Sequence, residues 1–210
     1  MNSRVILVSD DRSSLRSPDT LLWPDAACMR GIHTGEWTAH IFEYAMSFEG
    51  NMTQVRELAA ANGVGVLHPH GALATDPPGL IVCDVDSTVT RTEAIDLLAE
   101  CAGNADEVRE ITARAMVGEL DFTQSLYARV RCLEGLHIGA LEEAWKATVI
   151  TPGTAELVAA AHDVGAAVGL VSGGFTAIVD PLAEQIRADF AASNELEIVD
   201  NHLTGRVVGD

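Results

Sequence analysis

The sequence predicts an α/β fold in which a parallel sheet carries an inserted helical cap, preceded by a small α+β domain. Two apolar runs, LIVCD at 80–84 and AAVGLVSGG at 166–174, are typical of strands that are covered on both faces in a parallel sheet. Between them lie several segments with helical spacing, which are too many for a single crossover connection. A turn-rich stretch, ATDPPG at 74–79, separates this part from a differently patterned first part.

The first part, residues 1–76, is predicted to be a small domain of strands and one helix. The helix is expected at residues 51–62, because Val55 and Leu58 lie at helical spacing and Gly63 can end it. Apolar and β-branched runs predict the strands. These predicted strands are residues 4–8, 38–48 and 64–67.

The second part, residues 77–210, alternates strands and helices, with the cap at about 95–150. Glycines separate its helical segments. A further helix follows the second apolar strand, and we expect it to begin again at Pro181 with Asp180 as its N-cap. The predicted cap and core helices are residues 91–102, 104–117, 121–134, 137–148 and 153–164, and the strands of a closing hairpin are 196–199 and 205–208.

Composition and charge narrow the class of protein. The chain has 210 residues, of which 48% are hydrophobic and 21% charged, as is usual for a globular protein. Its formal net charge of −18 argues against nucleic acids and anionic membranes as partners. The sequence shows neither a leader-like start nor an apolar run long enough to span a bilayer, so we expect a soluble, cytoplasmic protein.

Acidic residues and glycines follow the two apolar strands at the point where each strand ends. Asp84 and Asp86 follow the first strand, and Ser172, Gly173 and Gly174 follow the second. Ligands of open parallel sheets bind beyond such strand ends. Paired carboxylates there can hold Mg²⁺, and one can attack phosphorus while the other acts as acid and base. Either motif alone also fits an ordinary strand-end turn, but the combination favours phosphoryl chemistry, with glycine N–H groups facing phosphate oxygens.

The motifs DVDSTV at 84–89 and VSGGF at 171–175 resemble those of the phosphoserine phosphatases, a branch of the haloacid dehalogenase-like hydrolases. The similarity extends over almost all of residues 80–210 and includes RAMVGELDFTQSLYARV and NELEI. It implies a Rossmann-like core and Mg²⁺-dependent hydrolysis of O-phospho-L-serine to L-serine and phosphate through an aspartyl-phosphate, the last step of serine biosynthesis. Residues before Gly79 loosely resemble an ACT-like regulatory domain, through which a homodimer is possible.

The resemblance also implies roles for single residues. Asp84 would be the nucleophile and Asp86 the general acid and base, and both would hold Mg²⁺, Asp86 through its carbonyl group. Ser172, Gly173 and Gly174 would bind the phosphate group. Two further positions, Met116 and Phe122, match residues that shape the substrate pocket, although each taken singly is also typical of an ordinary core.

Glu93 and Arg129 each allow two interpretations. Glu93 matches the glutamate that meets the substrate ammonium group, but Thr90 and Glu93 also form a capping-box pattern at a helix start. Arg129 shares a predicted helix face with Phe122 and Leu126. It therefore either extends along the surface to water or binds the serine carboxylate in bidentate fashion.

Two elements that the resemblance calls for are not found in these 210 residues. They are a lysine that holds the phosphate and the nucleophile, and a GDGxND segment whose first aspartate completes the Mg²⁺ shell. Lys146, the only lysine, falls in a predicted cap helix, and the closing Gly209-Asp210 lacks the rest of that motif. We therefore expect an N-terminal piece of a phosphatase with little turnover by itself, whose core is incomplete at the C-terminus and whose strand 80–84 lies at a sheet edge.

Two other functions fit the same residues. One is a different small-molecule phosphatase or phosphotransferase of this superfamily, because Glu93 and Arg129 favour an amino-acid substrate without proving it. The other is a non-catalytic regulatory protein that binds an amino acid or phosphate. The intact DVDST and SGGF motifs count against this second alternative.

Overall fold

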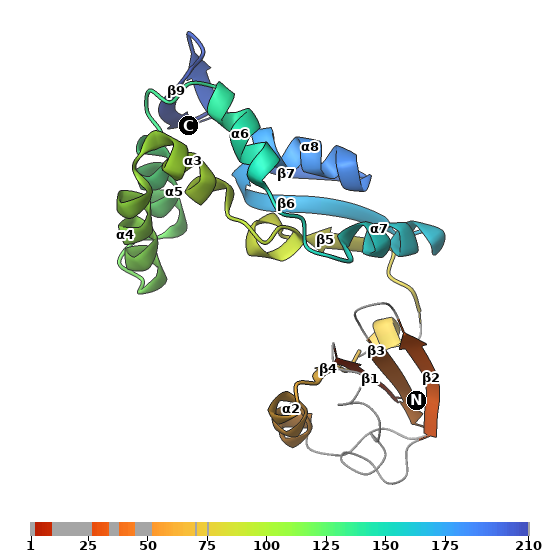
Figure 1. The fold of residues 1–210 in the computed structure, drawn as a ribbon. Helices are drawn as coiled ribbons and strands as arrows, with labels where there is room; N and C mark the ends of the chain where they lie inside the picture. Colours follow the sequence, from red (N-terminus) through yellow and green to blue (C-terminus); the bar gives the residue numbers. More distant parts are fainter. Residues whose placement is uncertain are drawn as a thin grey trace. The chain divides into compact units, whose positions relative to one another are not determined.

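The computed structural model describes residues 3–9, 27–33, 38–44, 52–69, 71–74 and 76–209. The chain divides into two compact units, Met1–Pro77 and Pro78–Asp210, and the division falls inside the turn-rich stretch at 74–79 (Figure 1). None of the described helices has the length and apolar character needed to cross a membrane.

The first unit contains a four-stranded antiparallel sheet with the strand order β2-β3-β1-β4. Strand β2 has no counterpart among the predicted strands, because its mixed sequence ACMRGIH carries no alternating pattern. The last residues of the predicted strand at 38–48 lie outside the described residues. The elements are β1 (Ser3–Ser9), β2 (Ala27–His33), β3 (Thr38–Tyr44), α2 (Met52–Ala61), β4 (Gly65–Leu67) and the short 3₁₀ helix η1 (Gly71–Ala74).

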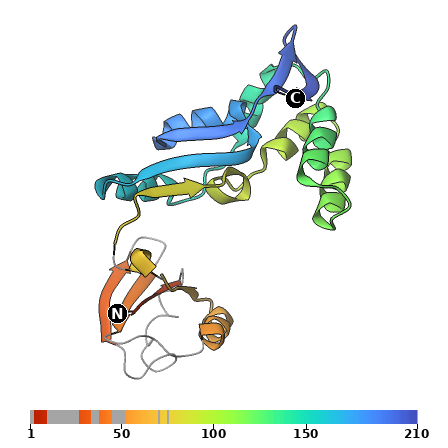
Figure 2. The ribbon, with the colours of Figure 1, turned by 180° about the vertical axis from the view of Figure 1, so that it is seen from behind.

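A three-stranded parallel sheet with the order β5-β6-β7 forms the centre of the second unit. Helices α7 and α8 cover one of its faces, where Ile81 of β5 and Leu170 of β6 join a single apolar cluster with both helices. Figure 2 shows the strands from the opposite side. The elements are β5 (Leu80–Cys83), α7 (Thr154–Asp163), β6 (Ala167–Phe175), α8 (Thr176–Ile186) and β7 (Phe190–Asn194).

The first apolar strand is an edge strand with one open face. Within the described chain, β5 pairs only with β6, which agrees with its expected place at an edge. Leu80 and Val82 point away from α7 and α8 and remain 53% and 51% exposed. The prediction that this strand is covered on both faces is therefore wrong for the described residues, because none of their elements packs on the second face.

Helix α8 continues through Pro181, so the predicted restart with Asp180 as a cap is wrong. Proline removes one backbone hydrogen bond from a helix interior. Burial of Ile178 and Val179 before the proline, and of Leu182 after it, holds both halves of the helix against the rest of the unit.

Four helices between β5 and α7 form the cap together with the β8–β9 hairpin. Their apolar cluster joins Leu98, Val130 and Leu133 to Leu203 of the hairpin and to Phe175 at the carboxyl end of β6. The predicted bounds of these helices differ by three residues or fewer, because apolar spacing and glycine stops mark them. The elements are α3 (Ala94–Ala102), α4 (Ala105–Met116), α5 (Phe122–Arg131), α6 (Gly139–Ala147), β8 (Leu196–Val199) and β9 (His202–Val207).

Candidate active site at the carboxyl end of the parallel sheet

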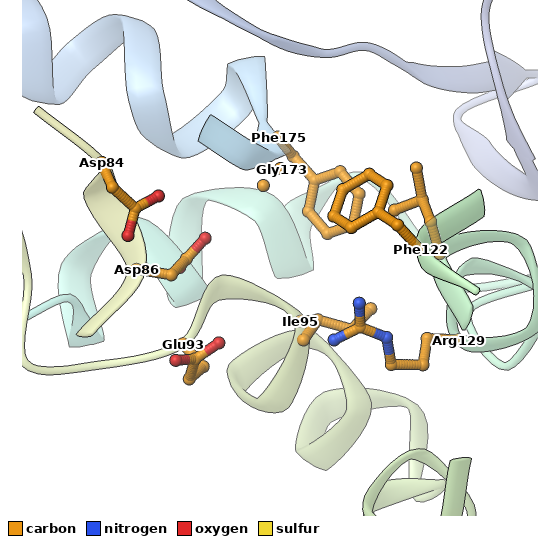
Figure 3. A pocket seen from close by; sticks show the side chains of 10 residues that line it. Asp84, Asp86, Glu93, Ile95, Phe122, Arg129, Gly173 and Phe175 are labelled. Atoms are coloured by element: carbon orange, nitrogen blue, oxygen red, sulfur yellow. The ribbon is translucent and has the colours of Figure 1, made fainter. Parts of the chain in front are cut away.

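A pocket of about 230 Å³ lies where β5 and β6 end, between the sheet and the cap (Figure 3). All of the predicted site residues except Met116 and Ser172 line it. The carboxylates of Asp84, Asp86 and Glu93 face the same space as the Arg129 guanidinium group (Figure 3). The lining residues are Asp84, Asp86, Glu93, Ile95, Phe122, Leu126, Arg129, Gly173, Gly174 and Phe175.

A tight turn after β5, Val85–Val89 (η2), contains Asp86, and Asp84 is the N-cap residue that precedes it. Val85 is buried, and its carbonyl oxygen accepts hydrogen bonds from the N–H group and the hydroxyl group of Thr90, which closes the turn. The Thr88 hydroxyl donates to Asp84 Oδ2 at 3.1 Å. Asp84 follows directly on the strand, so its carboxylate stands at the strand end, where the pocket opens.

Asp86 is held on two sides and is partly withdrawn from water. Its Oδ1 accepts the Ala94 N–H group at 2.8 Å, and its Oδ2 lies 3.4 Å from the Ser172 hydroxyl oxygen. Burial raises the pKa of the Asp86 carboxyl above its ordinary value, and the nearby charges of Glu93 and Asp84 act in the same direction, against the two hydrogen bonds. This environment favours the protonated form and suits a group that gives up a proton.

The carboxyl end of β6 leaves little room for a side chain at Gly174, and a side chain at Gly173 would have to move the Phe122 ring. A Cβ atom on Gly174 would lie 2.5 Å from Asp86 Oδ2 and 3.0 Å from Ser172 Oγ. On Gly173 it would lie 2.9 Å from the Phe122 ring, which reaches over from the cap. Ser172 is buried behind this surface, where its Oγ accepts the Gly174 N–H group at 2.8 Å. The backbone can therefore approach a ligand that a side chain would exclude.

Glu93 stands at the N-cap position of α3, but its side chain does not cap the helix. The Thr90 hydroxyl donates to the carbonyl oxygens of Val85 and Thr92, so the predicted capping box is absent and that interpretation is wrong. Glu93 Oε1 instead accepts a 2.5 Å hydrogen bond from Ser87, which has a left-handed backbone with φ 56°. Its other carboxylate oxygen is left to face the pocket.

Arg129 lies on the same side of α5 as Phe122 and Leu126, as its spacing predicts, and all three line the pocket. Its Nε donates to the Ser125 carbonyl oxygen at 3.3 Å. Among the described residues, no carboxylate lies within ion-pair distance of this half-buried guanidinium group. An unpaired cation in a cleft is suited to an anionic group of a ligand.

One predicted position, Met116, differs from the expected picture, and Lys146 does not. Met116, in the last turn of α4, is 84% exposed and does not line the pocket, because the helix end turns its side chain to solvent. Lys146 lies in a cap helix, as expected, and on the exposed side of α6 it pairs with Glu142 at 2.6 Å. The residues in the described ranges therefore bring no lysine to the pocket.

Four supporting residues are not predicted from the sequence. Ser87 contacts Glu93 from inside the DVDST motif, and Asn194 contacts the glycine loop from the NELEI motif. Asp121 and Gln124 form a capping box that begins α5 and so places Arg129. All four lie within motifs quoted for the resemblance, which is the available signal, although no local rule states what Ser87 and Asn194 contact.

The oxygen atoms of Asp84 and Asp86 in the pocket fit a magnesium ion whose remaining ligands are water and phosphate oxygens. The described residues contain no group of three or more His, Cys, Asp or Glu side chains that could hold a metal. Asp84 presents carboxylate oxygens to the pocket, and the Asp86 side chain is already engaged by Ala94 and Ser172, which leaves its carbonyl group. Mg²⁺ is commonly bound by one or two protein oxygens together with water and phosphate oxygens.

Comparison with known proteins gives three close likenesses. The family model described as haloacid dehalogenase-like hydrolase matches residues 81–210. A phosphoserine phosphatase of Streptomyces coelicolor is 48% identical over 72% of this chain and 37% of its own length. One from Streptococcus thermophilus is 49% identical over 63% of this chain and 61% of its own length. This chain therefore spans less than two thirds of these relatives.

A solved structure extends the likeness to the first unit. The structure of a probable phosphoserine phosphatase from Vibrio cholerae, in its unliganded form, matches 99% of this chain and 63% of its own chain. The two are 34% identical, with a TM-score of 0.74.

Proposed function

The chain belongs to the haloacid dehalogenase-like hydrolase family, and on this premise we propose that its pocket binds O-phospho-L-serine and hydrolyses it to L-serine and phosphate. The observation that carries the proposal is the division of one pocket into two ends. Asp84, Asp86 and the glycine loop form a phosphate end, and Glu93 and Arg129 form an amino-acid end. The names of the relatives support the same substrate.

At the phosphate end, an Asp84 carboxylate oxygen attacks phosphorus. The bond between phosphorus and the serine oxygen breaks, and an aspartyl-phosphate forms on Asp84. The glycine loop lies against the phosphate oxygens, and its lack of side chains allows this approach, since a side chain on Gly174 would collide with Asp86. Mg²⁺, held by the Asp84 carboxylate and the Asp86 carbonyl group, supplies positive charge for the phosphate oxygens when it is bound.

Asp86 moves the proton in both halves of the reaction. In its protonated form, which burial favours, it gives a proton to the departing serine oxygen. As a carboxylate it then takes a proton from the water that attacks the phosphoryl group. Phosphate leaves, and Asp84 returns to its starting form. The raised pKa of Asp86 places its proton affinity closer to neutral pH, where both steps need it.

At the amino-acid end, charge complementarity selects the substrate. The free carboxylate oxygen of Glu93 faces the ammonium group, and the unpaired Arg129 guanidinium faces the carboxylate. Phe122 closes this end over Gly173. A simple phosphate ester without these two charges would lose both contacts.

The test is the affinity of the 210-residue chain for two ligands, measured by calorimetry in the presence of Mg²⁺. Arg129→Ala should weaken binding of phosphoserine roughly 30-fold, as expected for loss of a charged hydrogen-bonded pair. Phosphoethanolamine lacks the carboxylate that Arg129 contacts. Its affinity should therefore change less than about threefold in Arg129→Ala. Arg131→Ala, an exposed arginine on the same helix, is the matched control. Equal weakening of both ligands by Arg129→Ala would rule out carboxylate recognition.

Turnover distinguishes the reaction from binding alone. Phosphate release from phosphoserine that requires Mg²⁺ and disappears in Asp84→Asn would show that these residues suffice for hydrolysis. Tight binding without release would show that the chemistry needs a group that they do not bring to the pocket. Tighter binding of another phosphate ester would favour a different phosphatase of the family.

A further inference from the structure

Asn194, the first residue of the NELEI motif, lies beside the glycine loop at the carboxyl end of β6. The parallel pairing of β6 with β7 shifts register between Val171 and Phe175, so Ser172, Gly173 and Gly174 have no ladder partners on β7. Asn194 bridges this gap with its side chain. Its Nδ2 donates to the carbonyl oxygen of Gly173 at 2.9 Å and to that of Gly174 at 3.4 Å.

These hydrogen bonds determine which edge of the loop faces the pocket. In a trans peptide the C=O and N–H groups point in opposite directions, and the chain contains no cis peptide among its described residues. The Gly173 carbonyl group points to Asn194, so the Gly174 N–H group points the other way. There it donates to Ser172 Oγ, next to Asp86. The loop thus turns the carbonyl groups of Gly173 and Gly174 toward Asn194 and away from the site.

The opposite orientation would disfavour a phosphate ligand. Carbonyl oxygens facing the pocket would repel an anion, whereas N–H groups attract one. Glycine places little restriction on such a rotation, because it lacks a Cβ atom. Neither residue has a side chain, and a Cβ atom on Gly174 would collide with Asp86, so the loop cannot obtain its orientation from side chains of its own.

We propose that Asn194 is a positioning residue that holds the carbonyl groups of Gly173 and Gly174 away from the pocket, so that they do not face the phosphate. The proposal rests on the proposed function, since it concerns the phosphate end of the same pocket. Asn194 does not line that pocket and acts through the loop. An asparagine suits this role, because its amide group donates two hydrogen bonds from one nitrogen.

The test compares Asn194→Ala and Asn194→Asp with the unchanged 210-residue chain, using inorganic phosphate and L-serine as separate probes in NMR titrations with Mg²⁺. Asn194→Ala should weaken phosphate binding about tenfold, as expected for losing hydrogen bonds that hold the loop. Asn194→Asp should weaken it further, because a carboxylate has the same shape but cannot donate. Affinity for L-serine, which reaches only Glu93 and Arg129, should stay within about twofold in both variants, since neither contact changes.

Asn104→Ala is the matched control, because Asn104 Nδ2 also donates to a backbone carbonyl, that of Cys132 at 2.7 Å, within the cap. It should lower the melting temperature and leave phosphate affinity unchanged. Unaltered phosphate affinity in both Asn194 variants would overturn the positioning role. So would an equal loss for phosphate and serine, which would indicate general damage. Failure of the unchanged chain to bind phosphate would instead refute the proposed function, and this inference with it.

Discussion

One aspartate lies at each end of strand β6, and the pKa values of the two carboxyl groups are shifted in opposite directions. At the amino end, Asp189 Oδ2 accepts the Val168 N–H group at 2.6 Å and lies 3.1 Å from His162 Nε2. These contacts lower the pKa of the Asp189 carboxyl. At the carboxyl end, burial raises the pKa of Asp86, although the Ala94 N–H group also donates to it.

The difference shows that solvent access, more than hydrogen bonding, determines the direction in which the pKa of each carboxyl group is shifted. Both aspartates accept a backbone N–H group at a similar distance. Asp189 remains about half exposed, so its charged form keeps its hydration and gains its contacts. Asp86 loses water and faces other acids, so its charged form is disfavoured. Asp189 therefore connects β6 to α7, while the surroundings of Asp86 suit the proton transfer proposed for it.

The largest effect is expected from Gly174→Ala at the carboxyl end. The new Cβ atom, 2.5 Å from Asp86 Oδ2, must displace the loop or the aspartate. Phosphate affinity should fall about 100-fold, as expected for losing one or two hydrogen bonds to a charged group. Phosphate titration followed by NMR measures the change.

The control lies on the same strand. On Gly169 a Cβ atom would meet the outer atoms of the Phe190 ring, which is 43% exposed and free to turn away. Gly169→Ala should therefore alter the melting temperature and leave phosphate affinity unchanged. An equal loss of affinity in both variants would mean that the two regions of β6 are not independent.

The carboxyl end of β6 could be predicted from the sequence, whereas the amino end could not. Asp84, Asp86 and the SGG loop are short contiguous motifs at ends of apolar strands, and strand ends of a parallel sheet meet at one edge. The contacts of Asp189 join residues 21 and 27 positions away, and no local pattern marks them. Strand β7 was missed for a similar reason, since its sequence FAASN has weak strand preference and depends on pairing with β6.

The errors in the cap and the sheet have the same origin. The helices were predicted because spacing and glycine stops are local properties. The continuation of α8 through Pro181, the open face of β5 and the exposure of Met116 depend on what packs against each element. That information is held by distant segments, which the local pattern does not specify.

An intermediate effect is expected from Asp189→Asn at the amino end. The amide retains an acceptor for the Val168 N–H group but loses the charge that this group and His162 stabilise. A lowered pKa means that the carboxylate contributes stability above the ordinary value of 3.8, and that this contribution is lost as pH falls through the folded-state pKa. The variant should melt at a lower temperature at pH 7, and the difference should shrink below about pH 4.

Thermal unfolding across pH measures this effect. Asp163→Asn, an exposed aspartate at the end of α7, provides the control. If the melting temperature of Asp189→Asn stays equally far below that of the unchanged chain at low pH, the Asp189 charge contributes nothing to the connection between β6 and α7.

The smallest effect, of opposite sign, is expected from Asp86→Asn at the carboxyl end. Burial disfavours the Asp86 charge, but the Ala94 and Ser172 hydrogen bonds offset part of that cost. Because the folded-state pKa is raised, the stability linked to the bound proton is complete below 3.8 and is lost as pH rises through the folded-state pKa. The amide carries no charge, so the variant should melt at a higher temperature than the unchanged chain at pH 7 and at the same temperature near pH 3. A lower melting temperature at pH 7 would mean that the Asp86 carboxylate, like that of Asp189, stabilises the fold, and the contrast between the two ends of β6 would disappear.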